Sequence, residues 1–187
     1  MRRPLKRRQL PGKDSPWTMG ERLRLAAWQI AWRLLCRWTP KPANPWRLMV
    51  LRMFGAQIEG RPFVHQRARI ALPWNVTLQD RSCVGDGANL YSQDRITLKT
   101  GSLVAQESYL CCGTHNLNDA EWPLMTAPIE VGERAFVGAR AFVLPGVTIG
   151  PRAIVGAMSV VTGDVAAETT VAGNPARPVK ARADEDC

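Results

Sequence analysis

The sequence predicts an all-β domain, a parallel β-helix of six-residue repeats that follows an N-terminal amphipathic helical arm. The main observation is a period of six in the aliphatic residues Val131, Val137, Val143, Ile149, Val155 and Val161. This period does not match the 3.6-residue turn of a helix, and glycines after several of these residues interrupt any long strand. Three short strands would close a triangular coil of about 18 residues, and stacked coils would pair at about 4.8 Å.

The residues before this array continue the solenoid with a longer repeat. Ile58, Val64, Ile70 and Val76 again stand six apart. Val76, Val84 and Leu90 are then followed twenty residues later by Ile96, Val104 and Leu110. We therefore expect two coils with two extra residues at one corner. The β-helix domain is predicted for residues 55–187, with a loop at 111–130 and a C-terminal tail.

Positive charge is concentrated before the solenoid. The 187-residue chain has a formal net charge of +9, and residues 1–52 hold 13 of its 25 Lys and Arg but two of its 16 Asp and Glu, which leaves −2 for the remainder. No motif that reads nucleic acid accompanies this charge, so we expect no nucleic-acid partner and favour an anionic membrane surface or a polyanionic partner. Residues 1–16, basic and proline-bearing, are predicted to be a disordered tail.

Residues 17–54 are predicted to form the amphipathic helical arm, capped by Thr18 and interrupted at Pro40. The predicted apolar face consists of Leu23, Ala27, Ile30, Leu34 and Trp38. Charged residues leave no uninterrupted stretch long enough to span a bilayer. Five of the seven tryptophans lie in the arm. Two interpretations stay open: peripheral membrane contact through residues 17–54, or covering of the open end of the solenoid.

The period fails between Leu110 and Val131, and the segment between them is predicted to be a functional loop. His115 stands at its root, directly after a predicted strand. Rigid backbone and solvent access at such a place suit a general base. A histidine in a loop is more often structural than catalytic, so its position alone leaves both roles open.

Cysteine and metal chemistry are alternatives for the same region. The five cysteines have no metal-ligand spacing, and without a secretory signal we expect reduced thiols in a cytoplasmic protein. Cys111 and Cys112 raise a Cys-His nucleophile as an alternative, although adjacent strand residues point to opposite sides. A zinc enzyme of this fold would need three histidine ligands, and the chain has only His65 and His115, so no metal is expected. A noncatalytic assembly module is a further alternative.

The six-residue array, the Thr114-His115-Asn116 loop and the ending from Val171 to Arg177 together resemble the hexapeptide-repeat acyltransferases. The resemblance covers residues 46–180 and points in particular to exopolysaccharide O-acetyltransferases of the colanic-acid type, relatives of the galactoside, maltose and nodulation acetyltransferases. It implies a left-handed β-helix and a homotrimer with acetyl-CoA in the groove between neighbouring subunits. The implied reaction is direct transfer of an acetyl group to a hydroxyl of a sugar or lipid-linked polysaccharide precursor. Another acyl donor or a small-molecule acceptor stays open.

The resemblance also implies roles for individual residues. His115 matches the general base, and Ala139 matches a small residue beside the pantetheine arm. Ala157 and Thr162 match positions farther along the groove, and Arg177 and Lys180 match basic residues near the CoA phosphates. Repeat packing is the alternative for the two alanines, and solvated tail charge is the alternative for the two cations.

The acceptor side departs from the family pattern. Galactoside-type enzymes hold the sugar with an asparagine and an aspartate, but the aligned places here are Gly87 and Gln93. Asp94 lies close by and is the candidate acceptor-binding residue, with a turn residue at the extra corner as its alternative.

Overall fold

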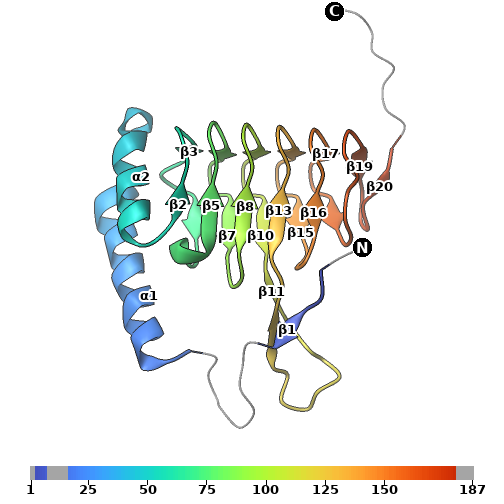
Figure 1. Cartoon of the computed structure of the whole chain (residues 1–187), viewed down its shortest axis with the longest axis horizontal. Helices are drawn as coiled ribbons and strands as arrows, with labels where there is room; N and C mark the ends of the chain where they lie inside the picture. Colours follow the sequence, from blue (N-terminus) through green and yellow to red (C-terminus); the bar gives the residue numbers. More distant parts are fainter. Residues whose placement is uncertain (1–2, 8–16, 180–187) are drawn as a thin grey trace, which may run out of the picture.

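The computed structural model of the chain describes residues 3–7 and 17–179. Its body is a parallel β-helix with three faces of short strands, and the predicted fold class is confirmed (Figure 1). The β2 face contains β2 (Gln57–Ile58), β5 (Val76–Leu78), β8 (Ile96–Leu98), β13 (Ile129–Val131) and β16 (Thr148–Ile149). The β4 face contains β4 (Arg69–Ile70), β7 (Asn89–Tyr91), β10 (Tyr109–Cys111), β15 (Phe142–Val143) and β18 (Val160–Val161). The β3 face contains β3 (Phe63–Val64), β6 (Cys83–Val84), β9 (Leu103–Val104), β14 (Phe136–Val137), β17 (Ile154–Val155), β19 (Thr170–Ala172) and the antiparallel β20 (Arg177–Pro178).

The core is the stack of aliphatic side chains that the period predicts. All six residues of the array from Val131 to Val161 are buried. The twenty-residue displacement also reappears as strand register, since Val76 pairs with Ile96 and Leu90 pairs with Leu110. The period therefore specifies which residues stack, and the parallel ladders follow from it.

The glycines after the inward aliphatic residues stand where adjacent coils are in close contact. A Cβ on Gly138 would lie 2.6 Å from the backbone nitrogen of Ala157, and a Cβ on Gly150 would lie 2.5 Å from that of Ala167. Real side chains do not approach backbone this closely. Glycine is therefore needed at these positions because the coils stack closely, and not because the backbone adopts an unusual dihedral angle.

The helical arm covers the first coil. It consists of α1 (Met19–Ala31), a π-helical turn (Trp32–Cys36), a 3₁₀ turn (Lys41–Ala43) and α2 (Asn44–Met53), and a further 3₁₀ turn (Pro73–Asn75) lies within the solenoid. Thr18 caps α1 as predicted: its Oγ1 accepts the N–H of Glu21 at 3.2 Å. Trp28 and Trp32 are buried, and their indole N–H groups donate to the carbonyls of Ile70 at 2.7 Å and Ala68 at 3.2 Å. These bonds satisfy carbonyls at the open end of the β4 face.

The predicted apolar face of the arm, which runs from α1 through the π-helical turn to Trp38, is not the face that packs on the solenoid. Its exposed fractions are 67% for Leu23, 59% for Ile30, 63% for Leu34 and 74% for Trp38. The helix is oriented instead by the tryptophans, which combine a large apolar surface with a donor for a free carbonyl. Within the described ranges no helix is both long and apolar enough to cross a membrane.

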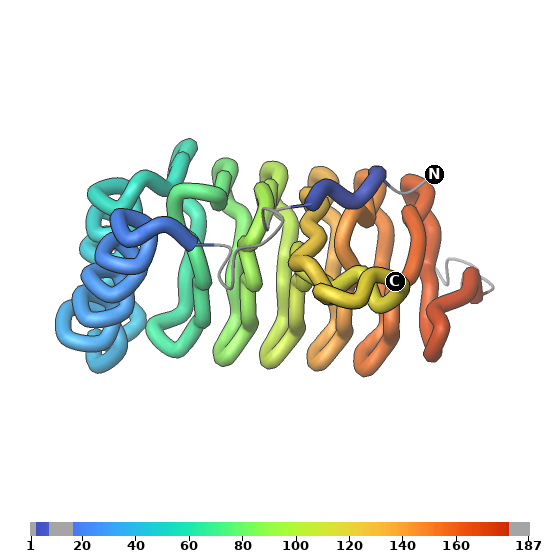
Figure 2. The backbone as a smooth tube through the Cα atoms, turned by 90° about the horizontal axis from the view of Figure 1, so that it is seen from below, coloured from blue at the N-terminus to red at the C-terminus, as the bar shows by residue number. Residues whose placement is uncertain are grey.

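A small sheet stands beside the solenoid. The loop between β10 and β13 forms a hairpin of β11 (Gly113–His115) and β12 (Leu124–Thr126), and β1 (Lys6–Arg7) pairs antiparallel with β12 (Figures 1 and 2). Residues 6 and 7, which lie within the predicted tail of residues 1–16, form a strand because the free edge of β12 offers them backbone partners. Residues 8–16 lie outside the described residues.

Candidate active site

His115 is held where the chain leaves the solenoid. After β10 the chain turns from the β4 face toward the β2 face, and at this corner β11 extends outward with His115 opposite Leu124 of β12. A Cβ on Gly113 would lie 3.1 Å from side-chain atoms of Tyr91 and Gln93. Glycine therefore lets the root of β11 pass close to the preceding coil, which positions the histidine.

One hydrogen bond fixes the tautomer of His115. Its Nδ1 lies 2.6 Å from the carbonyl oxygen of Trp122. A carbonyl oxygen only accepts, so Nδ1 carries the proton and Nε2 carries the lone pair. The side chain is exposed. An imidazole oriented by one nitrogen with the other free toward solvent can act as a general base.

The Trp122 carbonyl is oriented by the loop. Trp122 has a φ of 43°, in the left-handed region, and its N–H donates to the carbonyl of Asp119 at 3.0 Å. Nη1 of Arg7 lies 3.3 Å from a carboxylate oxygen of the same Asp119. Sequence reasoning missed both contributors, because a backbone oxygen has no sequence signature and a two-residue basic strand has no hydrophobic pattern.

Asp94 lies at the same corner as His115, one coil earlier. The corner carries Ser92 to Arg95 between β7 and β8, just as it carries the hairpin after β10. Oδ1 of Asp94 accepts the backbone N–H of Arg95 at 2.7 Å. Its side chain is half-buried. This contact is typical of a turn residue. The other carboxylate oxygen of Asp94 could still bind the acceptor substrate.

The two alanine candidates stack on another corner, between the β3 and β4 faces. Ala139 and Ala157 occupy the same position in successive coils, and the carbonyl of Ala139 accepts the N–H of Met158 at 2.9 Å. Ala139 is half-buried and Ala157 is exposed. A pair of small side chains on an open corner lets an extended ligand approach the backbone.

The remaining CoA candidates divide between the two corners. Residues 173–176 bond to Ser159 and Val160 at the alanine corner, and the exposed Arg177 follows them. Its guanidinium donates to the carbonyl of Ala176 at 3.0 Å, and its other donors can still bind an anion. Thr162 stands at the His115 corner, after β18. Lys180 lies outside the described residues.

Within one chain the structure thus brings Asp94 and Thr162 to the corner of His115, and it separates this corner from Ala139 and Ala157 by the whole β4 face. Within the described residues, 3–7 and 17–179, there is no group of three or more His, Cys, Asp or Glu side chains that could hold a metal ion.

The chain is similar to known bacterial transferases. Residues 128–163 match the family model described as bacterial transferase hexapeptide (six repeats). The chain is 34% identical to the putative colanic acid biosynthesis acetyltransferase WcaF of Escherichia coli (strain K12), over 89% of this chain and 92% of that protein. The resemblance seen in the sequence is therefore confirmed.

Solved structures with the same fold include two acetyltransferases. A hexapeptide-repeat-containing acetyltransferase from Vibrio cholerae O1 biovar eltor, complexed with acetyl-CoA, has a TM-score of 0.79 at 21% identity, and the match covers 91% of this chain and 93% of that one. A galactoside acetyltransferase in complex with coenzyme A has a TM-score of 0.79 at 18% identity, with 89% and 84% covered.

Proposed function

Because the chain belongs to the hexapeptide-repeat acetyltransferases, we propose that it transfers an acetyl group from acetyl-CoA to a hydroxyl of a sugar or lipid-linked polysaccharide precursor. The chain is an acyltransferase, and acetyl-CoA is its co-substrate. The acceptor class rests on the relative whose printed name places it in colanic acid biosynthesis. The observation that carries the reaction is the bond from Nδ1 of His115 to the Trp122 carbonyl, which leaves Nε2 as a base.

The proposed chemistry is direct transfer. Acetyl-CoA supplies a thioester, and Nε2 of His115 takes the proton of the acceptor hydroxyl as its oxygen bonds to the acyl carbon. The bond between that carbon and sulfur breaks, and the same proton passes from the imidazolium to the thiolate. The Trp122 carbonyl holds the imidazole throughout, because its partner Nδ1–H stays protonated. Ala139, Ala157 and Thr162 would line the path of the pantetheine arm, and Arg177 and Lys180 would meet the phosphates.

His115→Ala tests this assignment. We expect turnover to fall about 10²- to 10⁴-fold, the usual scale for loss of a general base. CoA release and acetylated glycan would be measured with acetyl-CoA and candidate glycan acceptors, and light scattering would check that assembly is unchanged. His65→Asn, which alters the other histidine, is the matched control. Near wild-type turnover in a correctly assembled His115→Ala protein would refute the proposal.

We further propose that the enzyme is a homotrimer whose active sites lie between subunits. The separation of the His115 corner from the Ala139 corner within one chain supports this, since a neighbouring copy can bring the two corners together. Mixing His115→Ala with Ala139→Trp gives a direct test. Each variant alone should have strongly reduced activity, whereas random trimers from an equal mixture should have an intact site at about a quarter of their interfaces. No recovery after verified subunit exchange would favour a site within one chain.

Peripheral contact with an anionic membrane, at the cytoplasmic face, is the proposed role of the exposed helix face. The face contains Leu23, Ile30, Leu34 and Trp38, all more than half exposed. Residues 17–54 carry seven Lys and Arg but one acidic residue, Glu21. Exposed apolar side chains beside excess positive charge suit an anionic lipid surface. This location would bring the enzyme to a lipid-linked acceptor.

Vesicle co-sedimentation with point variants tests the membrane contact. Deleting the arm would also remove the buried Trp28 and Leu51, so Leu34→Ser and Trp38→Ser are better variants. We expect wild type to pellet with vesicles containing phosphatidylglycerol and both variants to pellet less. Leu117→Ser, at a 72% exposed leucine of the loop, is the control. Equal pelleting of all proteins would remove the membrane proposal, and reduced self-association of the variants in light scattering would identify a second copy as the occupant.

A further inference from the structure

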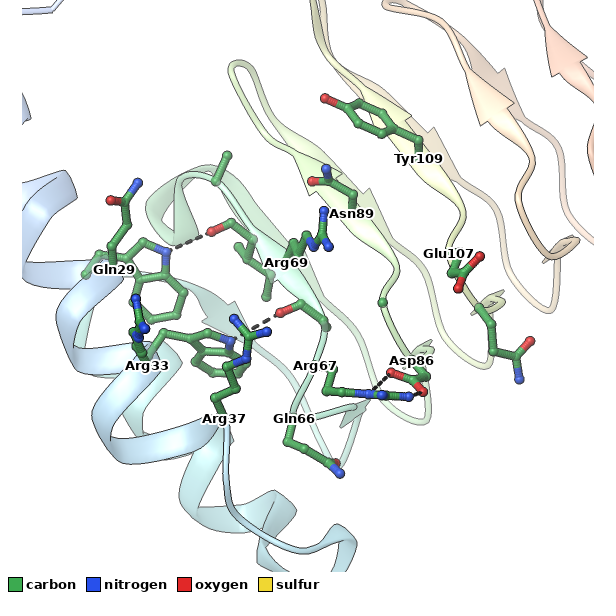
Figure 3. A pocket seen from close by; sticks show the side chains of 17 residues that line it. Gln29, Arg33, Arg37, Gln66, Arg67, Arg69, Asp86, Asn89, Glu107 and Tyr109 are labelled. Atoms are coloured by element: carbon green, nitrogen blue, oxygen red, sulfur yellow. Dashed lines mark hydrogen bonds and ion pairs between the residues drawn. The ribbon is translucent and has the colours of Figure 1, made fainter.

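A pocket lies between the helical arm and the β4 face. Its volume is about 930 Å³. One wall is the end of α1 with the π-helical turn, and the other is the outer surface of β4, β7 and β10 (Figure 3). Trp28 and Trp32 lie at the join, where their indole N–H groups are bonded to backbone carbonyls of the first coil. The two walls are therefore held at a fixed separation, and the pocket is preformed.

Three arginines of this pocket have no bonded partner among the described residues. Arg33 and Arg37 come from the helical wall, one turn apart, and Arg69 comes from β4 (Figure 3). No hydrogen bond or ion pair joins their guanidinium groups to any residue of the described ranges. All three are exposed, so their donors are available to a ligand.

The carboxylates that line the same pocket are already neutralised. Asp86 is paired with Arg67, and Glu107 is paired with Arg140 at 2.6 Å. The pocket is thus electropositive after its internal pairs are counted.

The other lining groups suit a sugar. Asn89 and Tyr109 follow Arg69 in register across neighbouring strands of the β4 face. The Tyr109 ring stacks on Phe142 with centroids 5.0 Å apart, which makes an aromatic strip beside the arginines. Strand β10 carries Tyr109 at the pocket and continues through Cys111 toward β11, which carries His115. An acceptor lying along these strands would run from the arginines toward the candidate base.

We propose that this pocket binds a phosphate or diphosphate ester of the acceptor, so that the substrate is a phosphorylated glycan rather than a neutral sugar. Guanidinium groups recognise phosphate oxygens through paired, charge-assisted hydrogen bonds, and three of them line this pocket without a bonded partner among the described residues. The amide of Asn89 and the phenol of Tyr109 would bond to hydroxyls of the attached sugar. The proposal rests on the proposed function for its acceptor class.

Binding measurements on the intact chain test the proposal without requiring catalysis. Titration calorimetry would compare glucose 1-phosphate, inorganic pyrophosphate and glucose as probes. We expect the two phosphates to bind and glucose to bind far more weakly. Arg33→Gln, Arg37→Gln and Arg69→Gln should each weaken phosphate binding about 10-fold or more, since each removes a charged donor. Arg61→Gln, at an exposed arginine outside the pocket, should leave the affinity for the phosphate probes within about twofold of wild type.

The outcomes separate this proposal from the proposed function. Equal affinity for glucose and glucose 1-phosphate, or no effect of the three pocket variants, would overturn the phosphate site even if CoA release with a neutral glycan still depends on His115. Conversely, phosphate binding with the expected variant pattern would support the site even if His115→Ala kept full turnover. A third arm uses phosphatidylglycerol vesicles: binding that needs Arg69 but is seen only with vesicles would assign the pocket to a lipid headgroup and overturn the glycan assignment.

Discussion

Nη2 of Arg7 lies 2.8 Å from a carboxylate oxygen of Glu121, although 114 positions separate the two residues in the chain. The pair joins β1 to the loop that carries Trp122, next in sequence to Glu121. Because the Trp122 carbonyl accepts the Nδ1–H of His115, a basic residue near the N-terminus is connected to the orientation of the candidate base through two contacts.

Arg7→Ala should therefore loosen the loop. We expect faster amide hydrogen exchange across residues 116–126 and a fall in turnover of a few fold, because exposed ion pairs contribute only about 0.2–1 kcal/mol each. Arg3→Ala is the matched control, since Arg3 pairs with Glu130 at 3.1 Å, outside the loop. Unchanged exchange in the loop of the Arg7 variant would show that backbone pairing of β1 alone holds it.

The stacked core could be predicted from the sequence, whereas the contacts of β1 and α1 could not. The period of six predicted the stacked core and the strand register because each inward position demands an aliphatic side chain. The pairing of Lys6–Arg7 with β12 depends on backbone groups of a distant hairpin, and no side-chain pattern records it. The packing of α1 could not be predicted either, because Trp28 is positioned by its hydrogen bond to the carbonyl of Ile70 as well as by its apolar surface. His115 could be found as a break in the period, but its tautomer depends on the fold of the loop.

Glycine spacing in the repeats makes a stability prediction. Gly150→Ala would place a Cβ 2.5 Å from the backbone nitrogen of Ala167, so the coils must separate. We expect a loss of about 1–3 kcal/mol in the free energy of unfolding, the usual cost of overpacking. Gly163→Ala is the control, because a Cβ there meets nothing within 4 Å. Thermal and denaturant unfolding would compare the two, and equal stability would mean that the coils adjust without cost.

The cysteines near His115 are expected to play no covalent role. Burial raises the pKa of the Cys111 thiol and of the Cys112 thiol, and the Cys111 thiol donates a hydrogen bond to the Gly113 carbonyl, with 3.0 Å between sulfur and oxygen. A thiol that stays protonated at neutral pH is a poor nucleophile. Cys111→Ser, whose hydroxyl can make the same bond, should keep turnover within about twofold. Intact-protein mass spectrometry after mixing with acetyl-CoA should find no acetyl-enzyme that depends on Cys111; a loss of turnover as large as that of His115→Ala would revive the cysteine route.

His65 should make the folded protein less stable in mild acid. Its pKa lies below the ordinary value of about 6.5, because burial and the charges of Arg67, Lys41 and Arg47 disfavour the imidazolium. Although Nδ1 lies 3.2 Å from Asp86, it accepts the backbone N–H of Arg67, and the Asp86 carboxylate is already paired with the Arg67 side chain. Above pH 6.5 both states are neutral at this residue and the stability is fully present.

As the pH falls from 6.5 toward the lower pKa of His65 in the folded state, the unfolded chain binds a proton at this residue and the folded chain does not. The free energy of unfolding therefore decreases. Each unit of pKa difference is worth about 1.4 kcal/mol. The measurement is denaturant unfolding of wild type and His65→Asn between pH 8 and pH 5. Wild type should lose more stability than the variant over this interval, because the asparagine cannot titrate. Parallel pH profiles would mean that the folded and unfolded states bind the His65 proton equally, and that the cations around it do not act on the imidazole.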